Sequence, residues 1–269
     1  MNDAKLFLDA GKLNEAVEAA LNLVKTNPTN ATARTFLFEL SCFSGDWKRA
    51  AKQLEVIGHQ DANAMIGSLI FQQNFKAEED RMKLFSDGLR PESILRFPKY
   101  VEELLAAVSL VREEKFGEAR LALDAVDEDR PAFPCTIDGV HYDDLRDHND
   151  LTMCIFEVLI KDTYTWLPFE HVRSIKFLER KSLRDAFWAQ AEVETINGTM
   201  GEMFFPTLYV NSWKNADDQI RLGRAVDWQD AGGDIYVGQG ARLYAFGGNS
   251  RSLLDISTIE FDPLGDDEE

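Results

Sequence analysis

The sequence predicts a chain of two parts, an N-terminal series of helices followed by a unit of mixed α and β structure. Over the first 130 residues, apolar side chains recur every three or four positions, which is the period of an amphipathic helix. Within this stretch a helix–turn–helix pattern repeats at an offset of 34 residues. Beyond residue 134 the period changes, and short runs rich in Val, Ile, Thr and aromatic residues predict strands.

The clearest repeat unit lies at residues 34–57, where two apolar helical faces flank the turn Ser44-Gly45-Asp46. An earlier copy begins at Gly11, 34 residues before Gly45, and a third lies at residues 115–131. The aligned positions are Gly11, Leu13, Ala16 and Leu23 with Gly45, Trp47, Ala50 and Ile57, and in the third copy Phe116 and Ala119. This is the period of tetratricopeptide repeats, so we expect a TPR-like helical domain.

Helix by helix, the pattern predicts a pair over residues 4–27 broken at Gly11 and a pair over residues 31–57. A helix over residues 61–75 and a separate one ending near Gly88 are expected to continue the stack, with a degenerate repeat in this stretch. A last pair covers residues 100–115 and 116–126, and two prolines in residues 130–134 mark a linker. We therefore expect a helical-repeat domain at residues 1–130, an acidic α+β domain at 135–265 and a frayed acidic tail at 266–269.

The second part is expected to be mainly antiparallel, and a barrel-like closure is one arrangement open to it. Residues 151–160 predict a buried strand that forms a hairpin with residues 164–168, and residues 169–175 predict a short helix. Asn197-Gly198 is a strong hairpin signal after a strand at 189–196. The other expected elements are a helical turn at 182–187 and strands at 175–178, 202–205, 207–210, 225–228, 235–237, 242–246 and 253–261.

Composition restricts the classes of partner. The formal net charge is −18, and residues 1–130 carry only −5 of it, from 22 acidic and 17 basic side chains. Nucleic acid is not expected as a partner, because a phosphate backbone requires a basic face. Three cysteines without a CxxC spacing predict neither a disulfide framework nor a zinc site. The sequence shows no signal peptide and no apolar run of membrane-spanning length, so we expect a cytoplasmic protein without membrane insertion.

Several motifs, in a fixed order along nearly the whole chain, resemble one known family. The helical part carries Gly45-Asp46-Trp47, then Arg49-Ala50 and Gln53-Leu54. The second part carries Asp138-Gly139 with an Asp-rich run, Tyr164-x-Trp166-x-Pro168-Phe169, Leu183-Arg184-Asp185, Pro206-x-Leu208-Tyr209 and Leu222-Gly223-Arg224. On these residues the chain resembles the ImpE/SciE family, the TagJ-type accessory proteins of bacterial type VI secretion. It departs from the family pattern at Val140-His141-Tyr142.

The resemblance implies a non-enzymatic adaptor that needs no cofactor and binds the small subunit of the contractile sheath through a short helical segment. The repeat pattern by itself indicates only a groove that holds a peptide or helix. In the repeat register, the first helix of each unit lines that groove and places Lys5, Asp9, Thr35, Glu39 and Cys42 there. Trp213, beside Lys214 and Asn215, is the tryptophan that we expect at an interface.

An alternative hypothesis is a metal-dependent hydrolase. Residues 141–150 are dense in imidazole and carboxylate groups, which bind divalent metals that can activate water. The candidate ligands are His141, Asp143, Asp144, Asp147, His148 and Asp150. Their spacing fits no standard ligand motif, and an acidic turn ahead of a buried strand explains the same residues. The hydrolase hypothesis requires that these side chains converge in a cleft.

Overall fold

Two glycine turns and one turn at Pro28 divide the first sixty residues into four helices, which we call the helical arm. The computed structural model describes residues 1–60 and 62–263. The arm comprises α1 (Asn2–Asp9), α2 (Leu13–Thr26), α3 (Ala31–Phe43) and α4 (Trp47–Gln60), each packed on the next. Gly11 and Gly45 have φ of +72° and +71° in the two turns, a conformation that glycine adopts without the cost a side chain would impose. Both predicted helix pairs are confirmed.

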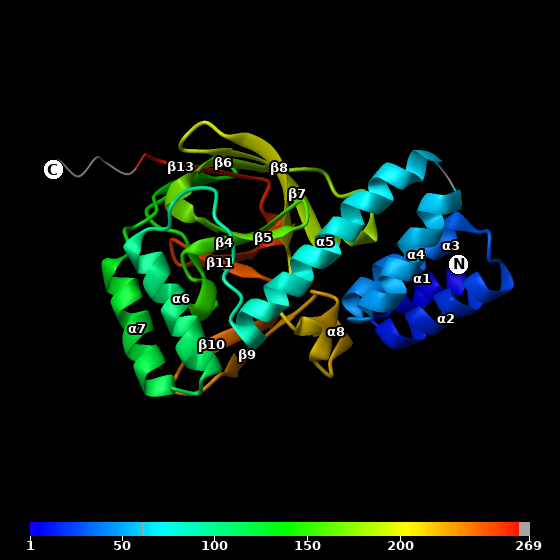
Figure 1. Cartoon of the computed structure of the whole chain (residues 1–269), viewed down its shortest axis with the longest axis horizontal. Coiled ribbons are helices and arrows are strands. Elements are labelled where there is room, and N and C mark those ends of the chain that lie inside the picture. The colour runs from blue at the N-terminus through cyan, green and yellow to red at the C-terminus, as the bar shows by residue number, and fades with distance from the viewer. Residues whose placement is uncertain (61, 264–269) are drawn as a thin grey trace.

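The predicted break near residue 75 is wrong, because residues Ala62–Asp87 form the single 26-residue helix α5. The stretch contains no proline, and the one glycine, Gly67, is tolerated inside a helix. Figure 1 shows α5 running from the arm across the C-terminal unit. Gly88 ends it with φ +78°, as the sequence predicted.

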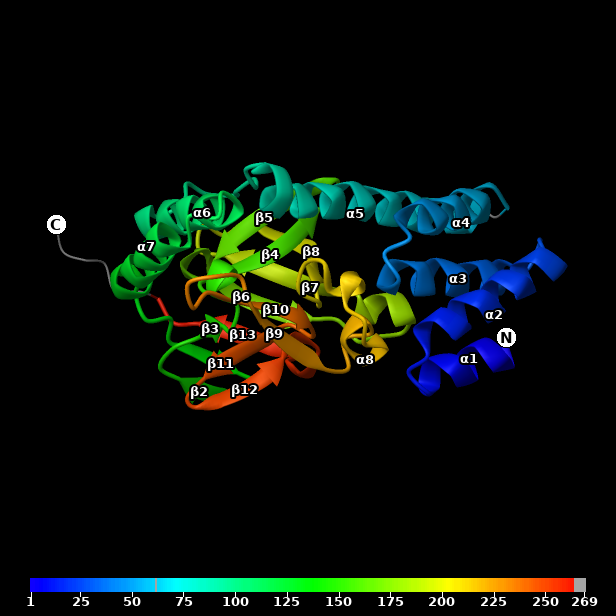
Figure 2. The ribbon, with the colours of Figure 1, turned by 90° about the horizontal axis from the view of Figure 1, so that it is seen from below.

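Helices α6 (Lys99–Arg112) and α7 (Phe116–Asp129) form the predicted last hairpin. They lie at the opposite end of the molecule from the arm, beside the sheet (Figure 2). They do not continue the stack of α1–α4, and α5 with the loop at 88–98 occupies the place of the expected degenerate repeat. The described residues therefore form two separate helix layers joined by α5.

The C-terminal unit is built on an antiparallel eight-stranded sheet in the order β2-β1-β13-β6-β7-β8-β4-β5. The sheet is open rather than a barrel, since β2 and β5 are its edges. Two small sheets, β9-β10 and β12-β11-β3, complete the unit. The strands are β1 (Cys135–Ile137), β2 (Val140–Tyr142), β3 (Arg146–Asp147), β4 (Ile155–Ile160), β5 (Thr163–Pro168), β6 (Val172–Phe177), β7 (Trp188–Thr195), β8 (Met200–Pro206), β9 (Val226–Asp230), β10 (Tyr236–Gly240), β11 (Leu243–Phe246), β12 (Asn249–Ser252) and β13 (Thr258–Phe261).

The local patterns placed most of these strands. The β4–β5 hairpin and the β7–β8 hairpin at Asn197-Gly198 are confirmed. The helix predicted at 169–175 is wrong, because only Phe169–His171 form a 3-10 turn before β6 begins. The strand predicted at 207–210 is reduced to one bridge, between Leu208 and Ala241. The predicted tail at 266–269 lies outside the described residues.

One hydrophobic cluster extends from the arm to the last strand and includes Ala4, Leu37, Leu84, Trp166 and Ile259. Cys42, Cys135 and Cys154 are free thiols inside the protein, as expected of small apolar side chains. No helix in the described ranges has the length and apolarity required to cross a bilayer.

Candidate functional site

A buried network of charges fixes α5 to the sheet. Arg81 of α5 donates to Glu157 of β4 through Nε and Nη2, both at 3.0 Å, and also pairs with Glu78. Arg242 donates to Glu157 and, at 2.8 Å, to Asp147. All five side chains are buried. Such a network is costly to bury but strongly specifies which helix docks on which strand.

The two guanidinium groups determine the charge of Glu157. Burial alone would raise the pKa of this carboxyl, but Arg81 and Arg242 outweigh burial and lower it to about 2. Glu78 lies one helical turn before Arg81, and burial raises the pKa of its carboxyl. Glu157 is ionised and its partners are buried, so the network supports the fold.

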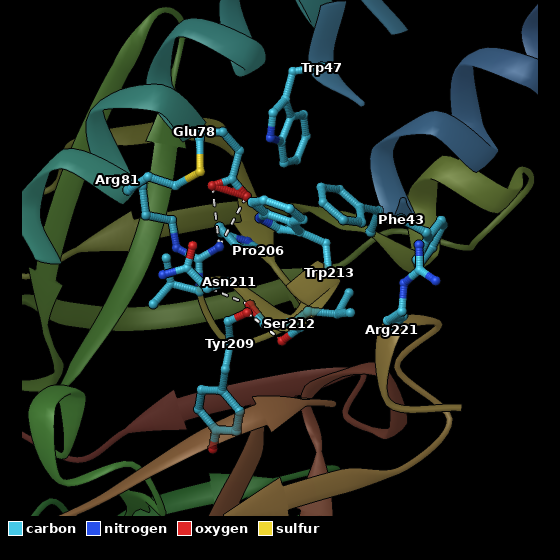
Figure 3. Close-up of a pocket in the computed structure, with 14 residues that line it drawn as sticks. Phe43, Trp47, Glu78, Arg81, Pro206, Tyr209, Asn211, Ser212, Trp213 and Arg221 are labelled. Carbon is cyan, nitrogen blue, oxygen red and sulfur yellow. Dashed lines mark hydrogen bonds and ion pairs between the residues drawn. The ribbon is translucent and has the colours of Figure 1, made fainter. Parts of the chain in front are cut away.

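Next to this network, the arm, α5 and the segment after β8 enclose a narrow crevice (Figure 3). Trp47 comes from the start of α4, Trp213 from the segment after β8, and Glu78 and Arg81 from α5. The indole Nε1 atoms of Trp47 and Trp213 and the Nε of Arg221 are buried there without a hydrogen-bond acceptor among the described residues. The crevice therefore offers donors to an acceptor such as a carbonyl oxygen or water.

Beside the crevice, the segment at 211–221 contacts both glycine turns of the arm. A side chain at Gly45 would overlap the ring of Trp213, and one at Gly11 would overlap Gln219. Asp218 caps α2, accepting from the Leu13 backbone N–H at 2.8 Å. Equivalent positions of the two repeat copies thus meet one C-terminal segment, a contact that sequence spacing could not reveal.

Two of the predicted groove residues are buried within the protein itself. Glu39 is 6% exposed and Cys42 is 0% exposed. Glu39 accepts from Arg184, in the 3-10 turn Leu183–Ala186, at 3.2 Å. The expectation of an open groove is wrong at these two positions, because the C-terminal unit covers this part of α3. Lys5 and Asp9 are exposed, Thr35 is half-buried, and half-buried Trp213 packs on the arm instead of projecting as a free interface.

The predicted metal cluster does not assemble. Asp147 is buried against Arg242, Asp144 pairs with Arg130 and Asp150 with Arg146, at 2.8, 2.8 and 3.0 Å. His148 bonds Ser250, whereas Asp143 points into solvent near His141. Within residues 1–60 and 62–263, no three His, Cys, Asp or Glu side chains are placed to hold a metal ion. The hydrolase hypothesis is therefore not supported, because Asp144, Asp147 and Asp150 pair with three different arginines and Asp143 lies in solvent.

The sequence interpretation missed an exposed apolar face on α5, which we call the α5 stripe: Met65, Ile66, Leu69 and Ile70. Their exposed fractions are 50, 66, 53 and 39%. The positions share one side of the helix, and residues 62–75 carry no charged side chain in a chain that is 28% charged. We expected these residues to continue the helical stack, yet contiguous exposed apolar surface is typical of interaction sites. The absence of charged residues from positions 62–75 was the signal in the sequence that could have indicated this exposed face.

Three comparisons relate the chain to known proteins. The model of the family described as ImpE protein matches residues 139–260. A type VI secretion system accessory component, TagJ of Pseudomonas aeruginosa, is 33% identical over 261 residues, which cover 97% of this chain and 91% of that protein. A crystal structure of a Vibrio parahaemolyticus protein has the same fold, with a TM-score of 0.88, 21% identity and coverage of 96% and 97% of the two chains.

Proposed function

The chain belongs to the ImpE family, and from this membership we propose that it is a non-enzymatic accessory protein of a type VI secretion system that works in the cytoplasm. The similarity to a protein named as such a component supports the role, since it extends over 97% of the chain. The separate ion pairs of Asp144, Asp147 and Asp150 with arginines favour binding over hydrolysis. The role would then be exercised through a protein partner.

We propose that the partner is a helical segment of the small sheath subunit and that it binds the α5 stripe. The main observation behind this proposal is that the α5 stripe is apolar, uncharged and exposed. An amphipathic helix binds by laying its apolar side chains on such a face. The 34-residue offset supports interpreting α1–α4 as two TPR-like units, which would carry α4 and the start of α5 as a presentation surface.

The test is a co-purification of the tagged protein with the small sheath subunit from the same secretion system. The variant Ile66→Asp/Leu69→Asp places two charges in the α5 stripe and is expected to lower the recovered subunit by about tenfold or more. Leu121→Asp is a control for the effect of adding a carboxylate elsewhere on the surface, because Leu121 of α7 is 72% exposed. Equal recovery with both variants would exclude the stripe as the binding face.

The predicted partner contacts that remain are Lys5, Asp9, Thr35 and Trp213. A further variant in the same experiment tests Lys5. Lys5→Glu changes an exposed charge on α1, away from α5. If this variant alone releases the subunit, the interface lies on the arm, as the repeat register predicted. If no variant and not even the unchanged protein retains the subunit, the proposed partner is wrong.

A further inference from the structure

We propose that the protein has a second binding surface, a groove between the arm and the C-terminal unit that takes an acidic, leucine-bearing peptide segment of a protein partner. We call it the basic groove and define it by Arg180, Arg224, Arg251, Leu183, Leu222 and Leu254. Leu8 of α1 closes it on the arm side, and β11 and β12 close it on the other. This surface is distinct from the α5 stripe, since Figure 2 shows α5 on one side of the molecule and α1, α8 (Asp218–Arg221) and β12 on the other.

The arginines of the basic groove are exceptional in this chain. In the described ranges, only four of the sixteen arginines form no ion pair with a carboxylate: Arg34, Arg96, Arg180 and Arg224. Two of the four line this groove. Among the described residues, the guanidinium group of Arg224 donates only to the Asp9 carbonyl oxygen, at 3.3 Å. Their guanidinium groups therefore have donors to offer a ligand.

The charge of the groove opposes that of the protein around it. Three arginines line it and Asp255 is the single carboxylate among the lining residues, whereas the whole chain carries −18. Arg251 is held at the rim by Asp138, at 2.8 Å. A positive groove on a negative protein selects an anionic partner and guides its approach. A polyphosphate such as nucleic acid is a poor match, because its further charges would meet the acidic surface beyond the groove.

The floor of the groove narrows the ligand class further. Leu222 is buried, and Leu183 and Leu254 are half-buried and remain open to contact. Guanidinium groups bind carboxylates through two parallel hydrogen bonds, and leucine side chains lose water-exposed area when they pack on an apolar floor. A segment with both carboxylates and leucines can bond to the arginines at the rim and pack on the leucines of the floor. A free anion can bond only to the arginines.

The experiment measures fluorescence anisotropy of the full-length protein with a labelled peptide that alternates glutamate and leucine. Two matched peptides replace either every glutamate by glutamine or every leucine by serine. We expect saturable binding of the parent peptide that weakens with added salt, and at least about tenfold weaker binding of each matched peptide.

Two double variants with the same change in charge locate the site. Arg180→Glu/Arg224→Glu is expected to weaken binding of the parent peptide by about tenfold or more, because it removes both unpaired guanidinium groups. Arg34→Glu/Arg96→Glu removes the other two and is expected to change it by less than about twofold. Circular dichroism checks the fold, and Arg180→Gln/Arg224→Gln replaces the first variant if it is unstable.

Three outcomes would overturn the proposal. Equal losses in the two double variants would assign binding to overall charge. Undiminished binding of the serine peptide, or full competition by inorganic phosphate, would reduce the groove to an anion site. Absence of saturable binding of the parent peptide would show that the basic groove does not bind such a segment. That result would not bear on the proposal for the α5 stripe.

Discussion

Glu39 carries a carboxyl group whose titration should be visible in the stability of the protein. Burial raises its pKa from 4.5 to about 7, although Arg184 opposes the shift. The folded state therefore binds more protons than the unfolded state between these two values, so the free energy of unfolding falls as pH rises through this window. A shift of this size corresponds to roughly 3 kcal/mol.

The measurement is urea unfolding of the protein and of Glu39→Gln at about pH 5 and about pH 8. Glutamine keeps the size of the side chain and cannot ionise. We expect the variant to gain stability relative to the unchanged protein as pH rises, because it avoids ionising a buried carboxyl group. If the two proteins show parallel pH profiles, Glu39 ionises as readily in the folded state as in the unfolded one.

Glu157 predicts the opposite pH behaviour. Its folded pKa of about 2 lies below the reference value of 4.5, so its stabilising contribution is complete above pH 4.5 and is lost as pH falls towards 2. Glu157→Gln leaves Arg81 and Arg242 buried with reduced compensation and should lower the free energy of unfolding at neutral pH by about 3–5 kcal/mol. Glu102→Gln, which breaks the exposed pair with Arg90, should change it by less than about 1 kcal/mol. The measurement is urea unfolding of the two variants at neutral pH. Similar losses in the free energy of unfolding would contradict the prediction.

The local sequence could not predict these residue environments. The helical period correctly placed Glu39 and Cys42 on one helix, α3, but Arg184, the partner of Glu39, lies 145 residues further along the chain. The environment of the buried Glu39 carboxyl depends on that distant contact. The same applies to Asp147, which the sequence offers as a metal ligand and Arg242 occupies instead.

At the scale of elements, the turn between α3 and α4 has two requirements that only glycine meets. Gly45 has a positive φ, and a side chain there would overlap the indole ring of Trp213. Gly45→Ala should therefore lower the free energy of unfolding by about 2 kcal/mol or more, from backbone strain and displacement of the ring.

Gly67→Ala is the internal control for this substitution. Gly67 lies inside α5, and an added methyl group would meet no atom within 4 Å. Alanine should stabilise the helix there by about 0.5–1 kcal/mol, because it restricts the unfolded chain more than glycine does. Thermal or urea unfolding would contradict the account if both alanine variants shifted the midpoint in the same direction.

The elements that the sequence predicted well are those fixed by short-range signals. Turns at Gly11, Pro28 and Gly45 defined α1–α4, and Asn197-Gly198 defined the β7–β8 hairpin. The continuity of α5 was not predicted, because its apolar face changes role along the helix. Near Ile66 that face is open to solvent, whereas further along Arg81 and Leu84 are buried against the C-terminal unit. A change of environment within one helix leaves no clear mark in periodicity.

At the scale of the whole molecule, the division into domains at residues 1–130 and 135–265 stays a prediction that unfolding experiments can test. The composition shift and the prolines at 130–134 support a boundary in the chain. The packing connects the two sides closely: one hydrophobic cluster spans them, Asp218 caps α2, and Arg81 pairs with Glu157. Contacts between residues this far apart in sequence were beyond the reach of local patterns.

From this shared core we expect the helical and sheet parts to unfold together. Far-UV circular dichroism reports chiefly on the helices. Tryptophan fluorescence reports chiefly on the C-terminal unit, which holds four of the five tryptophans, among them the buried Trp166 and Trp188. In a urea titration the two signals should give the same midpoint, since neither part can expose the shared cluster without the other losing contacts. An earlier loss of the helical signal would show that the domains are independently stable and that the arm–sheet contacts are weak. With Asp218→Ala, which removes the cap of α2, coincident midpoints at a lower urea concentration would show that the contact stabilises the molecule as one unit.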